Sequence, residues 1–197
     1  TTVTVTDADD PTISCASTAS ANTSGACSAF VSIAVPTTGD NCGVASVLND
    51  FNNTSNASDT YPVGTTSVTW TVTDVNGRTN TCVTTVTVTD IDDPMITCPT
   101  DVSVNNDLNI CGAAITIPAP ITSDNCGVAS VINDFNGTND ASDTYPVGVT
   151  TINWTVTDVN GNTTSCSMTV TVTDNENPAI TGCPATTSES KVSVFAC

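Results

Sequence analysis

Hydrophobic and polar residues alternate with a period of two along most of this chain. In the segment 68–73, valine and tryptophan alternate with threonine, and the segment 82–88 continues the pattern with cysteine, threonine and valine. A period of two places alternate side chains on opposite faces of a β-strand. No segment of helical length shows a period of 3.6. The chain is therefore predicted to be all-β.

A long internal repeat sets the expected domain organisation. Modules of about this size can each bury a core of their own, and short strands with a turn about every ten residues are typical of immunoglobulin-like sandwiches. We expect the last strand of a preceding module at 1–6, antiparallel immunoglobulin-like β-sandwiches at 7–90 and 91–174, and the start of a third module at 175–197, in an elongated array. The repeated positions are Cys27, Cys42, Trp70 and Cys82, which recur 84 residues later as Cys111, Cys126, Trp154 and Cys166.

The charge balance excludes several classes of partner. The 197 residues carry a formal net charge of −18, Arg78 and Lys191 are the two basic residues, and there is no histidine. Nucleic acids and anionic membranes require a basic surface, so neither is expected as a partner. With no histidine, no lysine in the full modules and no isolated cysteine, we expect that the protein is not an enzyme.

Ten cysteines indicate a disulfide framework and an oxidising compartment. Zinc is not expected, because no CxxC motif and no histidine occur. Strand parity predicts Cys42–Cys82 and Cys126–Cys166 bonds, with a local Cys15–Cys27 bond. The alternative is Cys15–Cys82 together with Cys27–Cys42. The cysteines expected in disulfides are Cys15, Cys27, Cys42, Cys82, Cys98, Cys111, Cys126, Cys166, Cys183 and Cys197, with Cys183 paired to Cys197.

A short acidic linker that ends in proline occurs at 7–11, 90–94 and 174–178, each time after a Thr/Val strand. Strand parity places two acidic loops of the following module, 36–43 and 74–77 in the first, at the same end. Calcium takes six to eight oxygen ligands, so we predict calcium at each junction; the alternative is that these residues only form solvated turns. The predicted ligands are Asp7, Asp9, Asp10, Asp40, Asp74 and Asn76 at the first junction, Asp90, Asp92, Asp93, Asp124, Asp158 and Asn160 at the second, and Asp174, Glu176 and Asn177 at the third.

The strings DNCG, YPVG and TTINWTVTDVNGNTTSCSMTVTV resemble the hyalin repeat module. The resemblance covers both full modules. It implies an immunoglobulin-like sandwich that occurs in tandem in extracellular adhesive proteins, including large bacterial surface proteins, and it implies no catalytic activity. The acidic linker also resembles the calcium linker of cadherins.

Two functions follow as hypotheses. The first is a structural segment of an extracellular fibre or stalk, with calcium-rigidified junctions, whose partners are neighbouring modules or identical subunits. The alternative is an adhesion module that binds a glycan or a protein through its loops, of which 52–58 and 136–142 differ most between the modules. The protein is expected to be secreted or on a cell surface, with a bacterial source. Tyr61 and Tyr145 are expected to be structural.

Overall fold

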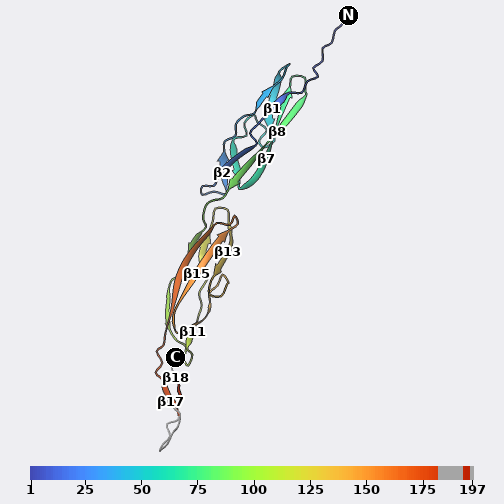
Figure 1. Cartoon of the computed structure of the whole chain (residues 1–197). Coiled ribbons are helices and arrows are strands. Elements are labelled where there is room, and N and C mark those ends of the chain that lie inside the picture. The colour runs from blue at the N-terminus through green and yellow to red at the C-terminus, as the bar shows by residue number, and fades with distance from the viewer. Residues whose placement is uncertain (182–192, 196–197) are drawn as a thin grey trace, which may run out of the picture. The chain divides into compact units, whose positions relative to one another are not determined.

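The computed structural model describes residues 1–181 and 193–195, and its elements in these ranges are all β-strands (Figure 1). The chain divides into two compact units, Thr1–Asp92 and Asp93–Cys197. The prediction of an all-β chain with immunoglobulin-like sandwiches is confirmed. In the part of the chain that is described, no helix has the length and hydropathy needed to cross a membrane.

The first unit is built around two long strands joined by a tight turn. One sheet has the order β2-β8-β7-β5, and the pairs β3–β6 and β1–β4 complete the unit. β7 and β8 pair from Gly64↔Val88 to Thr73↔Thr79, as their alternating Thr/Val pattern predicts. The strands are β1 (Thr12–Ser14), β2 (Thr18–Asn22), β3 (Ser28–Val31), β4 (Thr37–Gly39), β5 (Val44–Asn49), β6 (Asp59–Pro62), β7 (Gly64–Asp74) and β8 (Thr79–Thr89).

The second unit repeats this arrangement, with a sheet of order β10-β16-β15-β13 and the pairs β11–β14 and β12–β9. Beyond it, β17 (Ala179–Thr181) pairs with β18 (Ser193–Phe195). The strands of the repeat are β9 (Met95–Thr97), β10 (Val102–Asn105), β11 (Gly112–Ile115), β12 (Ile121–Ser123), β13 (Val128–Asn133), β14 (Asp143–Pro146), β15 (Gly148–Asp158) and β16 (Thr163–Thr173).

Two features differ from the sequence prediction. Residues 1–6, predicted as a strand, are exposed and form no strand, because a strand needs a partner for its backbone groups. The sandwiches are also not antiparallel throughout. β2 runs parallel to β8, from Thr18↔Thr85 to Asn22↔Thr89, and β10 runs parallel to β16. The early strand of each unit therefore enters the sheet beside the last strand and points the same way.

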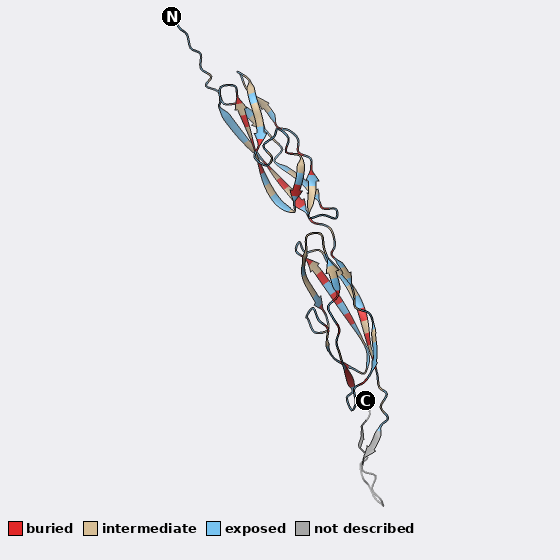
Figure 2. Cartoon of the chain, turned by 180° about the vertical axis from the view of Figure 1, so that it is seen from behind, coloured by how far each residue is buried: buried red, intermediate tan, exposed pale blue. Residues whose placement is uncertain are grey.

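Buried segments lie along the strands of both units (Figure 2). A fully buried tryptophan and a fully buried tyrosine are the largest side chains of each core. Tyr61 is fully buried, its hydroxyl donates to the Ala57 carbonyl at 2.7 Å, and its ring stacks on Phe51 with centroids 4.2 Å apart. Tyr145 makes the same contacts in the second unit, to Ala141 and Phe135. The expected structural role of the two tyrosines is confirmed.

The structure corrects the predicted disulfide pairing. Cys15 bonds to Cys82, and Cys98 bonds to Cys166. The preferred Cys42–Cys82 and Cys126–Cys166 pairs were wrong, and the alternative was right only for Cys15–Cys82. Cys42, expected in a disulfide, is a free and exposed thiol. The predicted Cys183–Cys197 pair lies outside the described residues.

The parallel strand explains these errors. Just before β2 joins β8, the Thr85 amide donates to the Ser17 carbonyl at 2.9 Å and the Thr84 hydroxyl to the Ala16 carbonyl at 2.8 Å. These contacts bring Cys15 beside Cys82. Residues 16–26 do not fold back as predicted, because Thr18–Asn22 continues along the sheet. Cys27 is thus carried to the other end of the unit, where the Val63 amide donates to its carbonyl.

Candidate metal centre

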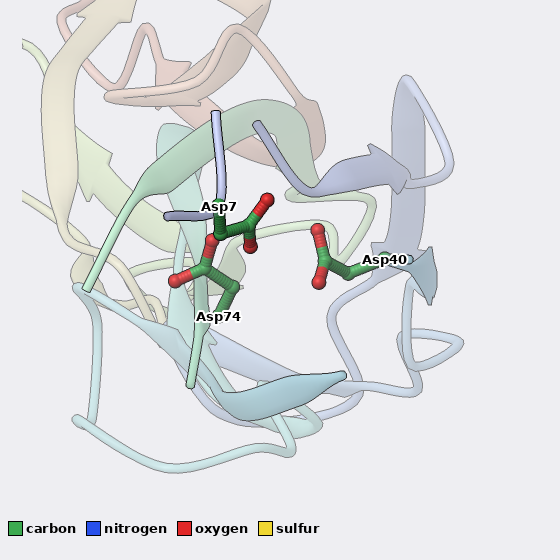
Figure 3. Close-up of side chains that lie close together, drawn as sticks. All are labelled: Asp7, Asp40 and Asp74. Carbon is green, nitrogen blue, oxygen red and sulfur yellow. The ribbon is translucent and has the colours of Figure 1, made fainter. Parts of the chain in front are cut away.

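Three carboxylates from distant parts of the sequence meet at the amino-terminal end of the first unit (Figure 3). Asp7 lies in the acidic linker, Asp40 in the loop between β4 and β5, and Asp74 at the end of β7. One oxygen from each lies within 4.8 Å of the others. The loops converge because β1 and β7 begin or end at this end of the sandwich, as strand parity predicts.

One oxygen of each carboxylate accepts hydrogen bonds from backbone amides of the turn in which that aspartate lies. Asp40 Oδ1 accepts the amides of Cys42 and Gly43, both at 2.8 Å. Asp74 Oδ1 accepts the amides of Asn76 and Arg78, also at 2.8 Å. The Asp9 amide donates to Asp7 Oδ1 at 3.2 Å. Aspartate commonly stabilises turns in this way, so the same side chains define the loops and fix their own direction.

The second oxygen of each carboxylate is left without a protein partner. The Oδ2 atoms of Asp7, Asp40 and Asp74 are buried and have no hydrogen-bond partner, and Asp74 as a whole is 1% exposed. A buried acceptor that lacks a partner is costly. Each pair of charges at this separation also repels by about 1 kcal/mol in water and about 3 kcal/mol at the effective dielectric constant of a protein surface. A bound cation would remove both costs.

The other ligands predicted for the first junction have different partners. Asp9 Oδ2 accepts the side-chain amide of Asn41 at 2.8 Å. Asp10 forms an ion pair with Arg78 at 2.7 Å, with side chains 61% and 40% exposed. Asn76 contributes its backbone amide to Asp74. Of the predicted set, the structure therefore brings Asp7, Asp40 and Asp74 together and does not add Asp9, Asp10 or the Asn76 side chain to the group.

The following linker is held by the first unit through contacts that the sequence analysis missed. Asp90 Oδ1 accepts the Thr23 hydroxyl at 2.8 Å, and Asp92 Oδ2 accepts the Gly25 amide at 2.9 Å. Asp90 is buried, at 5% exposure. Two predicted ligands of the second junction thus also tie the linker to the end of β2.

The second unit holds its own linker in the same way. Both carboxylate oxygens of Glu176 accept the Asn109 amide at 3.0 Å, and Asp174 Oδ1 accepts the Glu176 amide. Gly25 and Asn109 are equivalent in the repeat and both have positive φ, 76° and 60°, which glycine and asparagine tolerate best. The sequence signal that could have indicated these linker contacts is the occurrence of glycine and asparagine at equivalent positions, 84 residues apart. Asn177, a further predicted ligand, is exposed.

The acidic loops of the second unit repeat the local turns of the first. Asp124 Oδ1 accepts the amides of Cys126 and Gly127 at 2.8 Å. Asp158 Oδ1 accepts the Asn160 and Asn162 amides at 2.8 Å, and its Oδ2 accepts the Asn162 side chain at 2.7 Å. Burial favours a higher pKa for Asp158, but these hydrogen bonds outweigh it and lower the pKa. Asp93 is exposed.

The repeat corresponds to a known domain family. The HYR domain matches residues 6–88 and 89–172. This chain belongs to the HYR domain family. The resemblance to hyalin repeats is thereby confirmed, and the HYR domains carry the acidic loops at their amino-terminal ends.

Two proteins named hyalin are similar to this HYR chain. Hyalin of Strongylocentrotus purpuratus is 29% identical over 192 residues, which cover 93% of this chain and 15% of that protein. Hyalin of Lytechinus variegatus is 30% identical over 156 residues, 77% of this chain and 28% of that protein. The chain thus spans less than a third of the length of these relatives. They give no support for the expected bacterial source.

Solved structures with a similar outline include fibronectin(III)-like modules of Clostridium thermocellum CbhA, at 20% identity and a TM-score of 0.33, covering 83% of this chain and 94% of that one. Another is the protocadherin GammaB4 extracellular domain, at 18% identity and a TM-score of 0.41, covering 96% of this chain and 38% of that one. Mouse cadherin-23 EC22-24 has 11% identity and a TM-score of 0.40, covering 84% and 67%. The HYR assignment does not depend on these structures.

Proposed function

We propose that this chain is a structural segment of an extracellular fibre or stalk, in which calcium at the amino-terminal end of each HYR domain stiffens the junction with the preceding linker. The disulfides support an oxidising location outside the cytoplasm. The observation that carries the proposal is the set of three buried, unpartnered Oδ2 atoms of Asp7, Asp40 and Asp74. We also propose that the chain is not an enzyme, since the sequence has no histidine to act as a general base.

Calcium suits this site better than magnesium. Its shell of six to eight oxygens is flexible and accepts carboxylates, backbone carbonyls and water, whereas magnesium requires a near-ideal octahedron and releases its water reluctantly. Three carboxylates on three separate segments of the chain form a set whose spacing can adjust to a large ion. Because Asp7 belongs to the linker and the other two belong to the domain, a shared ion would restrict the angle between them.

The repeat extends the proposal to the second junction. Asp90 is equivalent to Asp7, Asp124 to Asp40 and Asp158 to Asp74. A calcium site that joins these three residues stays a prediction, as does one that uses Asp174 at the third junction. Asp158 differs from Asp74 because its Oδ2 atom accepts a hydrogen bond from the Asn162 side chain, so we expect weaker calcium binding there.

Adhesion through loops remains the alternative function. The loop at 52–56 is shaped by hydrogen bonds among Asn52, Thr54 and Asn56, and the corresponding loop of the second unit by Asn136, Thr138 and Asp140. Both tyrosines are buried and offer no platform for a sugar. Glycan or protein ligands of these loops would therefore contact polar groups or the exposed part of the Phe51 ring, which is 38% exposed.

Calorimetric titration of the whole chain with calcium chloride tests the metal site. We expect binding that weakens at least tenfold in Asp7→Asn and Asp74→Asn variants. Asp101→Asn is the matched control, because Asp101 is exposed and only accepts the Thr169 amide. Equal affinity in all four proteins would contradict the site.

Small-angle scattering at constant ionic strength, with calcium or with a chelator, tests the mechanical role separately. A particle that becomes longer and narrower in calcium, at constant β content by circular dichroism, supports stiffening. Calcium binding without a change in the scattering profile would leave the site but refute the mechanical role, and a glycan screen would then test the adhesion alternative.

A further inference from the structure

Three asparagines of the chain are followed directly by glycine, at 76–77, 136–137 and 160–161. Asparagine is a thermolabile residue, and a following glycine favours its reaction. Glycine has no Cβ that would obstruct its amide nitrogen as this nitrogen approaches the asparagine side chain. All of these residues are exposed. Exposure therefore does not distinguish the three positions, whereas their hydrogen bonds do.

The reaction is an intramolecular attack followed by hydrolysis. The backbone nitrogen of the glycine loses its proton and attacks Cγ of the asparagine, Nδ2 leaves as ammonia, and a cyclic succinimide forms. Water then opens either C–N bond of the ring and gives aspartate or isoaspartate. One water is consumed and one ammonia is released, and no oxidant, enzyme or metal is required. The attacking amide must first give up its hydrogen bond, and the asparagine side chain must be free to rotate.

Hydrogen bonds restrain two of the three positions. The Gly161 amide donates to Asp158 Oδ1 at 2.5 Å, and a hydrogen bond to a carboxylate is roughly twice as strong as one between neutral groups. The Asn136 side chain is held through both of its polar atoms. Its Oδ1 accepts the Thr138 amide at 3.1 Å, and its Nδ2 donates to the Asp140 carbonyl at 2.9 Å. The attacking nitrogen is thus restrained at the one position and the attacked side chain at the other.

The turn at 76–77 has neither restraint. The Gly77 amide donates to the Asp74 carbonyl at 3.3 Å, which is long for a hydrogen bond to a neutral acceptor. Asp74 Oδ1 instead accepts the amides of Asn76 and Arg78. Among the described residues, none bonds to the Asn76 side chain. The same Asp-Val-Asn-Gly motif thus has a weakly held glycine amide in the first unit and a firmly held one in the second.

We propose that Asn76 is a site of spontaneous deamidation, and that this reaction opens the Asp74 loop of the candidate metal centre. Both products add a negative charge to the loop. In isoaspartate the main chain runs through Cβ and Cγ, which inserts one carbon atom between the Cα of residue 76 and the nitrogen of Gly77. The amides of residue 76 and Arg78 lie on either side of this insertion, so both can no longer reach Asp74 Oδ1. The reaction itself does not depend on the calcium proposal.

Ageing the whole chain in a chelator tests the proposal. Peptide mapping by mass spectrometry follows the replacement of the NH2 group by OH at all three asparagines in one sample. In the folded chain we expect deamidation at Asn76 to be at least about tenfold faster than at Asn136 or Asn160. In urea with the disulfides reduced, the three rates should become similar. A rate at Asn76 that does not exceed the others in the folded chain, or a difference that persists in urea, would overturn the proposal.

Matched variants identify the source of the isoaspartate. Asn76→Ser should remove most of the isoaspartate that the folded chain forms, whereas Asn160→Ser should leave it. Deamidated chains carry an additional negative charge and separate from the parent by ion exchange, and NMR distinguishes isoaspartate from aspartate at position 76. In the isoaspartate form, hydrogen exchange of the Arg78 amide should be at least about tenfold faster than in the fresh chain. Unchanged exchange would refute the opening of the loop, and undiminished isoaspartate in Asn76→Ser would refute the site.

Discussion

The two units have the same strands and nearly the same phrases, yet they differ at several buried or acid-rich positions. Trp70 donates through Nε1 to the Thr84 hydroxyl at 3.2 Å, whereas the equivalent of Thr84 is Met168. Within the described structure, Trp154 Nε1 is buried and has no hydrogen-bond partner. In the first core, the Nε1–H group of the tryptophan therefore has a hydrogen-bond acceptor. In the second core, a larger apolar side chain takes the place of that acceptor and the Nε1–H group stays without a partner.

The acid-rich ends differ in a related way. The first unit has Arg78, which pairs with Asp10 and leaves Asp74 Oδ2 unpartnered. The second has Asn162 at that position, and its side chain binds Asp158 Oδ2. A single substitution between near-identical repeats thus decides whether this carboxylate oxygen is left without a protein partner or accepts a hydrogen bond from a side chain.

The largest loss of stability is expected on removal of the disulfide within each unit, a feature that both units share. Replacing both Cys15 and Cys82 by alanine opens a link across 67 residues, and the chain-entropy model gives a loss of about 4 kcal/mol. The Cys98→Ala/Cys166→Ala variant should lose the same amount, because its separation is 68 residues. Urea unfolding followed by tryptophan fluorescence measures both. A difference above about 2 kcal/mol would show that the two bonds are not equivalent.

Exchanging the residue beside each tryptophan should sharpen the comparison of the cores. Thr84→Met inserts extra volume and removes bonds to Trp70 and to the Ala16 carbonyl, so we expect a loss of about 2 kcal/mol. Met168→Thr leaves a cavity but offers Trp154 a hydroxyl, so its loss should be smaller than the 2–5 kcal/mol typical of large-to-small changes. Chemical denaturation of both variants gives the comparison. A Met168→Thr loss larger than that of Thr84→Met would contradict the proposed compensation.

The Asn162 contact should be visible in the titration of Asp158. Because hydrogen bonds lower the folded-state pKa of Asp158, its contribution to stability is present above the pKa of the unfolded chain and is lost as the pH falls through the folded value. Asn162→Ala should raise the folded pKa and make the second unit less dependent on pH in that acidic range. NMR titration of the Asp158 carboxyl carbon measures the shift, with Asn41→Ala as a control in the other unit. An unchanged pKa would show that the backbone amides alone set it.

The smallest change in the free energy of unfolding is expected for a substitution beside the turn that follows β5 and β13. Asp134 has a lowered pKa because the side chain and the amide of Asn153 both donate to it, whereas Asp50 receives only the Thr69 amide. Asn153→Thr, which copies the first unit, should cost about 0.5 kcal/mol at neutral pH, since the site is exposed. The loss should vanish at acidic pH below the pKa of Asp134. Thermal unfolding at both pH values checks this, and an equal loss at both would exclude an effect through the carboxylate.

The sequence alone established the strand class, the repeat and the grouping of Asp7, Asp40 and Asp74, because period-two patterning fixes which residues face the core and strand parity determines at which end each loop lies. The sequence was not sufficient to predict which cysteines pair in disulfides. Local spacing gave no sign that β2 runs parallel to β8, and that single pairing brings Cys15 to Cys82 and takes Cys27 to the opposite end. The ligand list was also too long, because a linear cluster of aspartates does not show which carboxylates are already bonded. Asp10 meets Arg78 and Asp92 meets Gly25 only once the chain is folded, since both contacts join residues more than 60 positions apart.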